Sequence, residues 1–212
     1  GKMTMQLYFV RHGESEANLL HQFSNRPGRH GLTERGRKQA AELAGMLAGI
    51  PFKCIYTSPL LRAIQTAEIL SANLNAPVIV TDALREYDVG KFEGSDDPAD
   101  WQEYDEVLDA WLLRGEWDRR TGGGESFHEI RARFEPLIRQ LCASAQAGDH
   151  YALVGHGGTC RCMLPLVLSN LSFEWIRHQP IHHTTPILAE LLPAGLQARR
   201  WGGITFEEQR SI

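Results

Sequence analysis

Short apolar runs alternate with longer stretches of helical periodicity along the chain. The apolar runs predict strands at residues 6–10, 54–57, 77–80 and 152–155, because strands of a parallel sheet are buried on both faces. Apolar side chains recur at helical spacing between these runs. The predicted helices cover residues 14–22, 33–48, 126–146 and 159–168, and a further one begins at 58. This alternation predicts an α/β fold, a three-layer α/β/α sandwich around a mostly parallel central sheet.

Local signals place several element boundaries. Thr33 is a good N-cap for the helix that follows it, and Ser58 with Pro59 is expected to cap and begin the next helix. Pro136 lies inside the predicted helix 126–146, where we expect a kink or a break. Residues 187–192 and 196–201 flank a Pro-Ala-Gly turn and predict a C-terminal hairpin.

Residues 95–124 differ in character from the rest of the chain. Trp101, Trp111 and Trp117 stand among many carboxylates, and three glycines follow. We expect an amphipathic helix over residues 97–113. The chain, 1–212, is then a single domain in which 95–124 is an insertion that forms a small helical cap over a site. The alternative is a surface helix with a solvated acidic face.

Composition excludes several classes of protein. The chain is 42% hydrophobic and 23% charged, and its formal net charge of -4 disfavours broad binding to nucleic acid or to acidic membranes. No apolar run approaches the roughly 20 residues of a membrane span, and residues 5–10 are too few for a secretory signal. Four cysteines make no disulfide framework, so we expect reduced thiols in a cytoplasmic protein.

Two of the predicted strands end at a histidine. The first runs into Arg11-His12 and the last into His156, and ligands bind at the carboxyl edge of open α/β sheets. The helix that begins at 58 carries Arg62 in its first turn, where free backbone N–H groups already attract phosphate. Two imidazoles and two guanidiniums in one crevice need an anion, and the simplest is a phosphoryl group.

Six segments, in order along the chain, carry a family resemblance. They are Arg11-His12-Gly13-Glu14-Ser15 with Asn18, then Leu32-Thr33-Glu34 with Gly36, Gln39 and Ala40, then Ser58-Pro59-Leu60 with Arg62, Ala63, Thr66 and Ala67, then Leu84-Arg85-Glu86 with Gly90, Glu93 and Gly94, then Gly124-Glu125-Ser126, and finally Val154-Gly155-His156-Gly157-Gly158. Together they resemble the histidine phosphatase superfamily, and more closely its phosphoglycerate-mutase-like branch.

The resemblance implies a chemical role for each of five residues. His12 is the nucleophile and forms a phosphohistidine, and the flanking arginines should lower its pKa and keep it neutral. Arg11, Arg62 and His156 hold the phosphoryl oxygens, which stabilises the transition state without a metal or another cofactor. Glu86 gives a proton to the leaving oxygen and then takes one from the incoming water.

Four further residues are candidates for contact with the substrate. Asn18 is expected to donate a hydrogen bond to the phosphoryl group, and Ser24, Gly157 and His183 are expected to line the same site. The pair His182-His183 also invites a metal-site interpretation. Neighbouring residues of an extended segment point to opposite faces, so we expect no metal there.

These residues favour a metal-independent phosphomonoesterase that acts on a small phosphorylated metabolite. The first alternative is a phosphoglycerate mutase, an isomerase, in which Arg119 and Arg120 could meet the substrate carboxylate. The acidity of residues 95–123 disfavours so anionic a substrate. The second alternative is a non-catalytic binder of a phosphorylated ligand, which would be expected to lack the nucleophile or the acid. The sequence leaves the oligomeric state open.

Overall fold

The computed structural model describes residues 4–207. A seven-stranded sheet forms its centre, with the strand order β3-β2-β4-β1-β5-β6-β7. The strands β3, β2, β4 and β1 pair in parallel, whereas β5, β6 and β7 add antiparallel pairings at one side. The strand bounds are β1 (Gln6–Arg11), β2 (Phe52–Thr57), β3 (Val78–Val80), β4 (His150–Gly155), β5 (Ile187–Leu192), β6 (Gly195–Trp201) and β7 (Ile204–Thr205).

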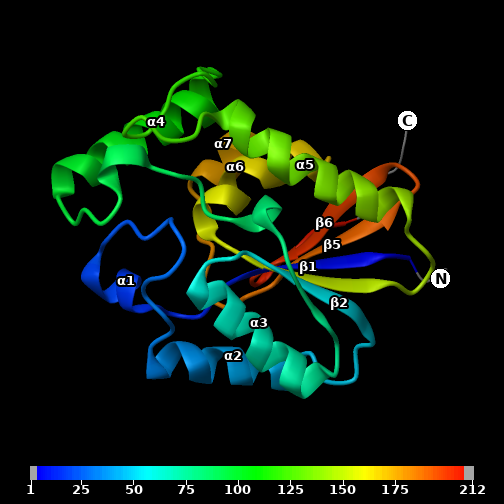
Figure 1. The fold of residues 1–212 in the computed structure, drawn as a ribbon. Coiled ribbons are helices and arrows are strands. Elements are labelled where there is room, and N and C mark those ends of the chain that lie inside the picture. Colours follow the sequence, from blue (N-terminus) through cyan, green and yellow to red (C-terminus); the bar gives the residue numbers. More distant parts are fainter. Residues whose placement is uncertain (1–3, 208–212) are drawn as a thin grey trace.

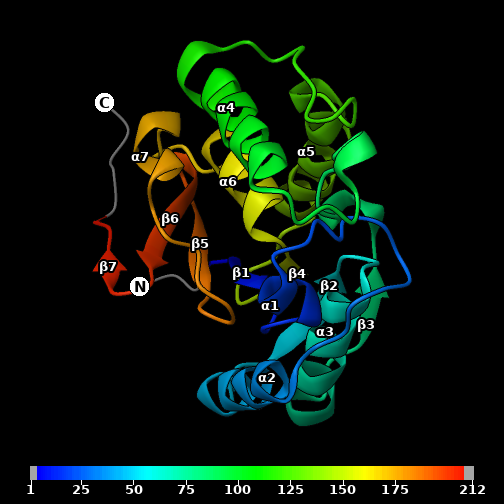
Figure 2. The same cartoon turned by 90° about the vertical axis from the view of Figure 1, so that its left-hand side faces the viewer.

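Helices cover both faces of this sheet (Figures 1 and 2). The pair α2 and α3 lies on one face, and α4 to α7 lie on the other, so the predicted three-layer α/β fold is confirmed. The short α1 lies beyond the carboxyl ends of the parallel strands, facing α4. The helix bounds are α1 (Glu16–Leu20), α2 (Glu34–Met46), α3 (Leu61–Leu74), α4 (Pro98–Arg114), α5 (Phe127–Ala143), α6 (Gly157–Val167) and α7 (Phe173–Arg177), with 3₁₀ turns at Asp82–Leu84 and Gly90–Phe92.

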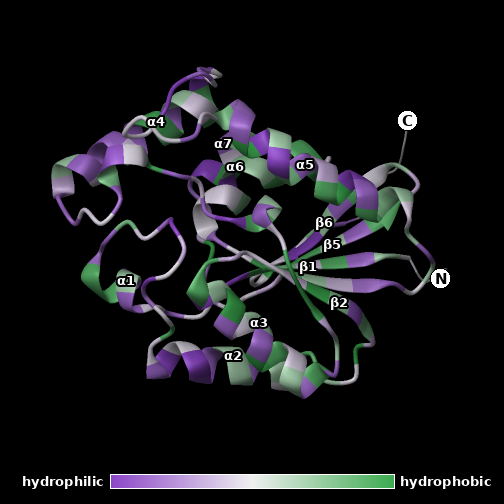
Figure 3. Cartoon of the chain, viewed as in Figure 1, coloured by the Kyte–Doolittle hydropathy of each residue, from purple (hydrophilic) through white to green (hydrophobic). Residues whose placement is uncertain are grey.

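Strand β1 separates two hydrophobic cores. Leu7 and Phe9 belong to the core beneath α4 to α7, whereas Tyr8 and Val10 belong to the core against α2 and α3. Successive side chains of a strand point to opposite faces, so a strand that feeds two cores must be apolar throughout. Figure 3 shows that apolar residues follow the strands through the middle of the molecule.

The structure corrects several local expectations. Helix α3 begins at Leu61 after the N-cap Leu60, so Ser58 and Pro59 precede it, and the Ser58 hydroxyl accepts a hydrogen bond from the Leu60 N–H instead. The predicted helix 14–22 is shorter at both ends, because α1 begins after its N-cap Ser15 and ends at Leu20, before the C-cap His21, whose φ is 51°. Helix α5 continues through Pro136 without a break, held by the buried side chains around it. The sequence interpretation missed α7 and β7.

Both halves of segment 95–124 contact the rest of the chain, and in the first half the Trp101 indole N–H donates to the His21 carbonyl. Trp111 is buried in the core beneath α4, and its indole N–H donates to the Arg119 carbonyl at 2.8 Å. The glycines that follow bring two backbones together, because a Cβ on Gly124 would lie 1.9 Å from the Asp88 carbonyl oxygen. Gly122 and Gly124 therefore have a packing role, whereas a Cβ on Gly123 would meet no neighbour.

The four cysteines agree with the expectation of reduced thiols. All four cysteines are free, and Cys160 and Cys162 lie on α6, as expected. Across residues 4–207, no helix combines the length and the apolar character that a membrane crossing requires. The cytoplasmic location stays a prediction.

Candidate active site

The two histidines that follow β1 and β4 lie side by side. The parallel register pairs Arg11 with Gly155, so His12 and His156 leave the sheet at the same level. Their ring centroids are 5.1 Å apart, and their exposed fractions are 3% and 1%. The predicted convergence of two imidazoles at the carboxyl edge of the sheet is therefore present.

The hydrogen bonds of His12 define which of its ring nitrogens carries the proton. Nδ1 lies 2.6 Å from the Gly13 carbonyl oxygen, which can only accept, so Nδ1 is protonated. Nε2 consequently has a free lone pair, and Arg62 Nε donates to it at 3.1 Å. Arg62 is held in turn by a hydrogen bond from Nη1 to the Ser24 carbonyl, at 2.7 Å. The imidazole thus presents a nucleophilic nitrogen beside a guanidinium.

Burial and positive charge keep both imidazoles neutral. Burial lowers the pKa of His12 well below its ordinary value, and the guanidinium of Arg62 lowers it further. The pKa of His156 is lowered by the same two causes, in the same order. Burial also lowers the pKa of Arg62, to about 10, so this guanidinium stays charged at neutral pH. The flanking arginines therefore lower the pKa of His12, as expected, although burial lowers it more.

The loop before β5 holds the Arg11-His12 pair in place. Arg11 Nη1 donates to the Ile181 carbonyl at 2.8 Å, and the Thr184 N–H donates to the Arg11 carbonyl at 2.8 Å. His183 Nδ1 donates to the His12 carbonyl at 2.7 Å. Within residues 4–207, the buried Arg11 Nε has no hydrogen-bond partner. It is therefore a candidate donor to an anion.

Glu86 lies against the N-terminus of α6. Its carboxylate accepts hydrogen bonds from the Gly158 N–H at 3.0 Å and the Thr159 N–H at 2.8 Å. The Thr159 hydroxyl lies 2.9 Å from the same carboxylate. A helix N-terminus attracts negative charge, so the first turn of α6 fixes this carboxylate at the edge of the cleft.

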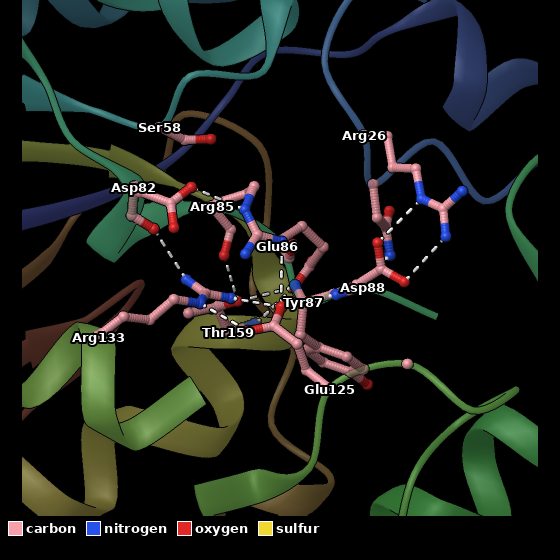
Figure 4. Close-up of polar contacts among 12 residues, drawn as sticks. Arg26, Ser58, Asp82, Arg85, Glu86, Tyr87, Asp88, Glu125, Arg133 and Thr159 are labelled. Atoms are coloured by element: carbon pink, nitrogen blue, oxygen red, sulfur yellow. Dashed lines mark hydrogen bonds and ion pairs between the residues drawn. The ribbon is translucent and has the colours of Figure 1, made fainter. Parts of the chain in front are cut away.

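A network of ion pairs holds the segment that carries Glu86 (Figure 4). Arg133 on α5 binds Glu125 through two hydrogen bonds, at 2.9 and 3.1 Å, and donates to the Asp82 carbonyl at 3.0 Å. Arg85 also binds Glu125, at 3.0 Å. The side chains of Arg133, Glu125 and Arg85 are 12–17% exposed. Because Arg85 precedes Glu86 directly, these contacts fix the backbone at Glu86.

These parts surround a cleft of about 150 Å³. Of the residues predicted from sequence, Arg11, His12, Asn18, Ser24, Arg62, Glu86 and Gly157 line it. His156 lies beside His12, with Nε2 at 2.8 Å from the Ser58 hydroxyl. His183 is not among the lining residues, although its ring lies 5.4 Å from that of His12. His182 is exposed and His183 half-buried, and His183 lies in a turn rather than in the extended segment that was expected.

Several cleft residues were missed at the sequence level. Ser58 and Thr159, which contact His156 and Glu86 without lining the cleft, were also missed. Ser58 lies in a segment that carried the family resemblance and Thr159 directly follows one, which was a usable signal. Phe23, Trp101 and Tyr104 line the cleft itself. No local pattern singled out Phe23 or Tyr104, and Trp101 was one of three tryptophans in its segment.

Comparison with known proteins supports a family assignment. The family model described as histidine phosphatase superfamily (branch 1) matches residues 7–203. One relative, the 2,3-bisphosphoglycerate-dependent phosphoglycerate mutase of Azorhizobium caulinodans, is 31% identical over 196 residues, which cover 89% of this chain and 93% of the relative.

Two solved structures are similar over almost the whole chain. A mycobacterial glucosyl-3-phosphoglycerate phosphatase has a TM-score of 0.74 at 25% identity, covering 93% of this chain and 98% of its own. A putative alpha-ribazole-5'-P phosphatase from Escherichia coli has a TM-score of 0.73 at 26% identity, covering 94% and 97%. The relatives therefore include both phosphatases and a mutase.

Proposed function

The chain belongs to the histidine phosphatase superfamily, as its six motif segments predicted, and we propose that it is a metal-independent phosphomonoesterase. Its substrate is a small phosphorylated metabolite, and the reaction passes through a phosphohistidine. The observation that carries this proposal is the state of His12. Its Nε2 is unprotonated and lies beside Arg62 in the cleft that Glu86 also lines.

The reaction takes place in two displacements. In the first, His12 Nε2 forms a bond to phosphorus while the bond from phosphorus to the ester oxygen breaks, and Glu86 gives its proton to the departing alkoxide. In the second, Glu86 takes a proton from water as the water oxygen attacks phosphorus. The bond to Nε2 then breaks, which returns His12 to its neutral form and releases inorganic phosphate.

The charged groups around His12 favour the transition state of both steps. Negative charge accumulates on the equatorial phosphoryl oxygens, where Arg11 and Arg62 supply fixed positive charge and buried donors. His156 and Asn18 add hydrogen bonds in this proposal. Preorganised donors of this kind need no reorganisation during the reaction, so a metal is not required for charge stabilisation.

Mutase activity is the second candidate, because the Azorhizobium relative is named a phosphoglycerate mutase. A phosphoglycerate also carries a carboxylate, and Arg119 and Arg120 were the candidates to bind it. In the structure Arg119 binds Glu106 at 2.9 Å, and Arg120 binds Glu129 and the Gly124 carbonyl. Neither lines the cleft, which favours the phosphatase over the mutase.

A screen of phosphate release over a panel of metabolite phosphate esters, with and without a chelator, tests the proposal. We expect release that the chelator does not change, and a phosphohistidine at His12 that is detected after an alkaline quench, in which the P–N bond survives, or by phosphorus NMR. Interconversion of 2- and 3-phosphoglycerate with bisphosphoglycerate, without phosphate release, would identify a mutase instead. Absence of any phosphohistidine with every ester would favour the non-catalytic binder.

A further inference from the structure

One wall of the cleft is made of aromatic side chains that no chemical step uses. The Phe23 and Trp101 rings stack with centroids 3.8 Å apart and planes at 18°. Tyr104, one turn further along α4, lies 5.5 Å from the Trp101 ring and also lines the cleft. Flat apolar surface beside a phosphate site can bind only the alcohol half of the ester.

Hydrogen bonds hold this aromatic wall in one arrangement. The Trp101 indole N–H donates to the His21 carbonyl at 2.8 Å. The Phe23 N–H donates to the Ser95 carbonyl at 3.1 Å, and the Gly94 N–H donates to the Phe23 carbonyl at 2.7 Å. Because the two segments are tied together on both sides of the stack, the wall is formed before a ligand binds.

Positive charge in the cleft comes from the side chains beside His12. Among the described residues that line it, Arg11 and Arg62 are the only arginines or lysines, and both are needed for the phosphoryl group. A second hollow begins on the other side of Trp101, and its charged lining residues are Asp96 and Asp105. A carboxylate or a second phosphate on the alcohol half would therefore meet aromatic rings and acids with no cation to pair it.

We infer that the substrate is a phosphate monoester whose alcohol half carries no negative charge and presents a flat apolar face to Trp101. The inference rests on the proposed phosphatase function and narrows its substrate class. Apolar contact with the ring supplies binding, and the acidic surroundings select against multiply anionic esters. Trp101 is thus a specificity-determining residue at the rim of the cleft.

Three esters of unactivated primary alcohols test the inference, because their leaving groups differ little in chemistry. They are 2-phenylethyl phosphate, glycerol 3-phosphate and 3-phosphoglycerate. We expect kcat/KM for phosphate release to be highest with the phenylethyl ester, and at least about tenfold lower with 3-phosphoglycerate. Equal kcat/KM values for 2-phenylethyl phosphate and 3-phosphoglycerate, or a higher value for 3-phosphoglycerate, would overturn the inference while leaving the phosphatase function intact.

The same segment offers a matched pair of tryptophans for mutation. Trp117 also stacks on a phenylalanine, Phe127, at 17°, and its indole also donates to a backbone carbonyl, that of Trp111. Trp117 does not line the cleft. Trp101→Leu should lower kcat/KM for 2-phenylethyl phosphate about tenfold and leave kcat/KM for 3-phosphoglycerate unchanged. Trp117→Leu should keep the wild-type ratio of kcat/KM between these two esters.

Equal losses on all three esters with Trp101→Leu would assign Trp101 to the fold and refute its role in specificity. If that variant does not fold, Trp101→Phe, which keeps a smaller flat face, should give an intermediate ratio. Gln102→Lys adds a cation to the hollow beside Trp101 and should raise kcat/KM for 3-phosphoglycerate alone. If no ester releases phosphate while phosphoglycerates interconvert, the proposed function itself fails.

Discussion

The two ends of the cleft are built in different ways. At the phosphoryl end, His12 and His156 follow adjacent parallel strands, and Arg62 lies in the first turn of α3, so topology alone brings them together. At the rim, Phe23 and Trp101 come from a loop and a helix outside the sheet, joined by their own contacts. The difference teaches that the proposed catalytic end is fixed by the central sheet, whereas the end that we infer selects the alcohol depends on packing outside the sheet.

The largest expected effect in this comparison is that of His12→Ala. It removes the nitrogen that we propose attacks phosphorus, so phosphatase activity should fall by several orders of magnitude with every ester. A rim substitution should change only the ratio between esters. Steady-state kinetics on the three primary-alcohol esters, with circular dichroism to verify folding, measures both. If the His12→Ala protein kept most of its activity, His12 would not be the nucleophile and the proposed mechanism would be wrong.

Glu86→Gln should have the next largest effect. The amide keeps the size of the side chain and cannot transfer the proton, so kcat should fall by about 10²–10⁴-fold with 2-phenylethyl phosphate. With an activated aryl ester the loss should be far smaller, because that leaving group departs as an anion. Comparable losses with both esters would exclude Glu86 as the acid and leave it a structural carboxylate at the N-terminus of α6.

The difference between the two ends also explains how far the sequence could predict the structure. The four apolar runs and the helical periodicity between them predicted the layers, because the pattern of a buried strand depends on its own residues. His12, His156 and Arg62 were predicted for the same reason, since each directly follows a central strand or begins the next helix. Family resemblance then supplied Glu86, whose segment has no regular pattern of its own.

The remaining features depend on contacts between residues distant in the chain. Phe23 and Trp101 are 78 positions apart, and nothing local indicates that they stack. The same holds for Ser58, which was expected to cap α3 and instead binds His156 across 98 positions. His183 was expected in the cleft and contacts the backbone of His12. Such contacts follow from the complete packing, which a short window of sequence does not contain.

A smaller effect is expected from the brace behind Glu86. Arg133→Met removes the two hydrogen bonds to Glu125 and those to the backbone at Asp82, leaving a mostly buried carboxylate with Arg85 as its remaining arginine partner. The free energy of unfolding should fall by about 1–3 kcal/mol, and kcat should fall about tenfold with the phenylethyl ester, because the position of Glu86 becomes less defined.

Arg139→Met is the matched control for this brace. Arg139 lies on the same helix and pairs with Glu135, but its side chain is 74% exposed, so its loss should cost about 0–1 kcal/mol of stability and leave kcat unchanged. Chemical denaturation measures the free energy of unfolding of both variants, and steady-state kinetics measures their kcat. Equal effects of the two substitutions would show that the network in Figure 4 stabilises the helix without positioning the acid.

The smallest expected effect concerns pH and the loop that holds Arg11-His12. Burial, and to a lesser extent the nearby charge of Arg11, lowers the pKa of His183 from 6.5 to about 4. Between pH 6.5 and 4 the unfolded chain therefore binds a proton that the folded chain does not, so stability falls as the pH is lowered through this range. His183→Gln should reduce the drop in Tm between pH 7.5 and 5 by a few degrees, whereas the exposed neighbour substitution His182→Gln should keep the wild-type drop. A pH dependence that is identical in all three proteins would show that the imidazole of His183 does not stay neutral in the folded chain.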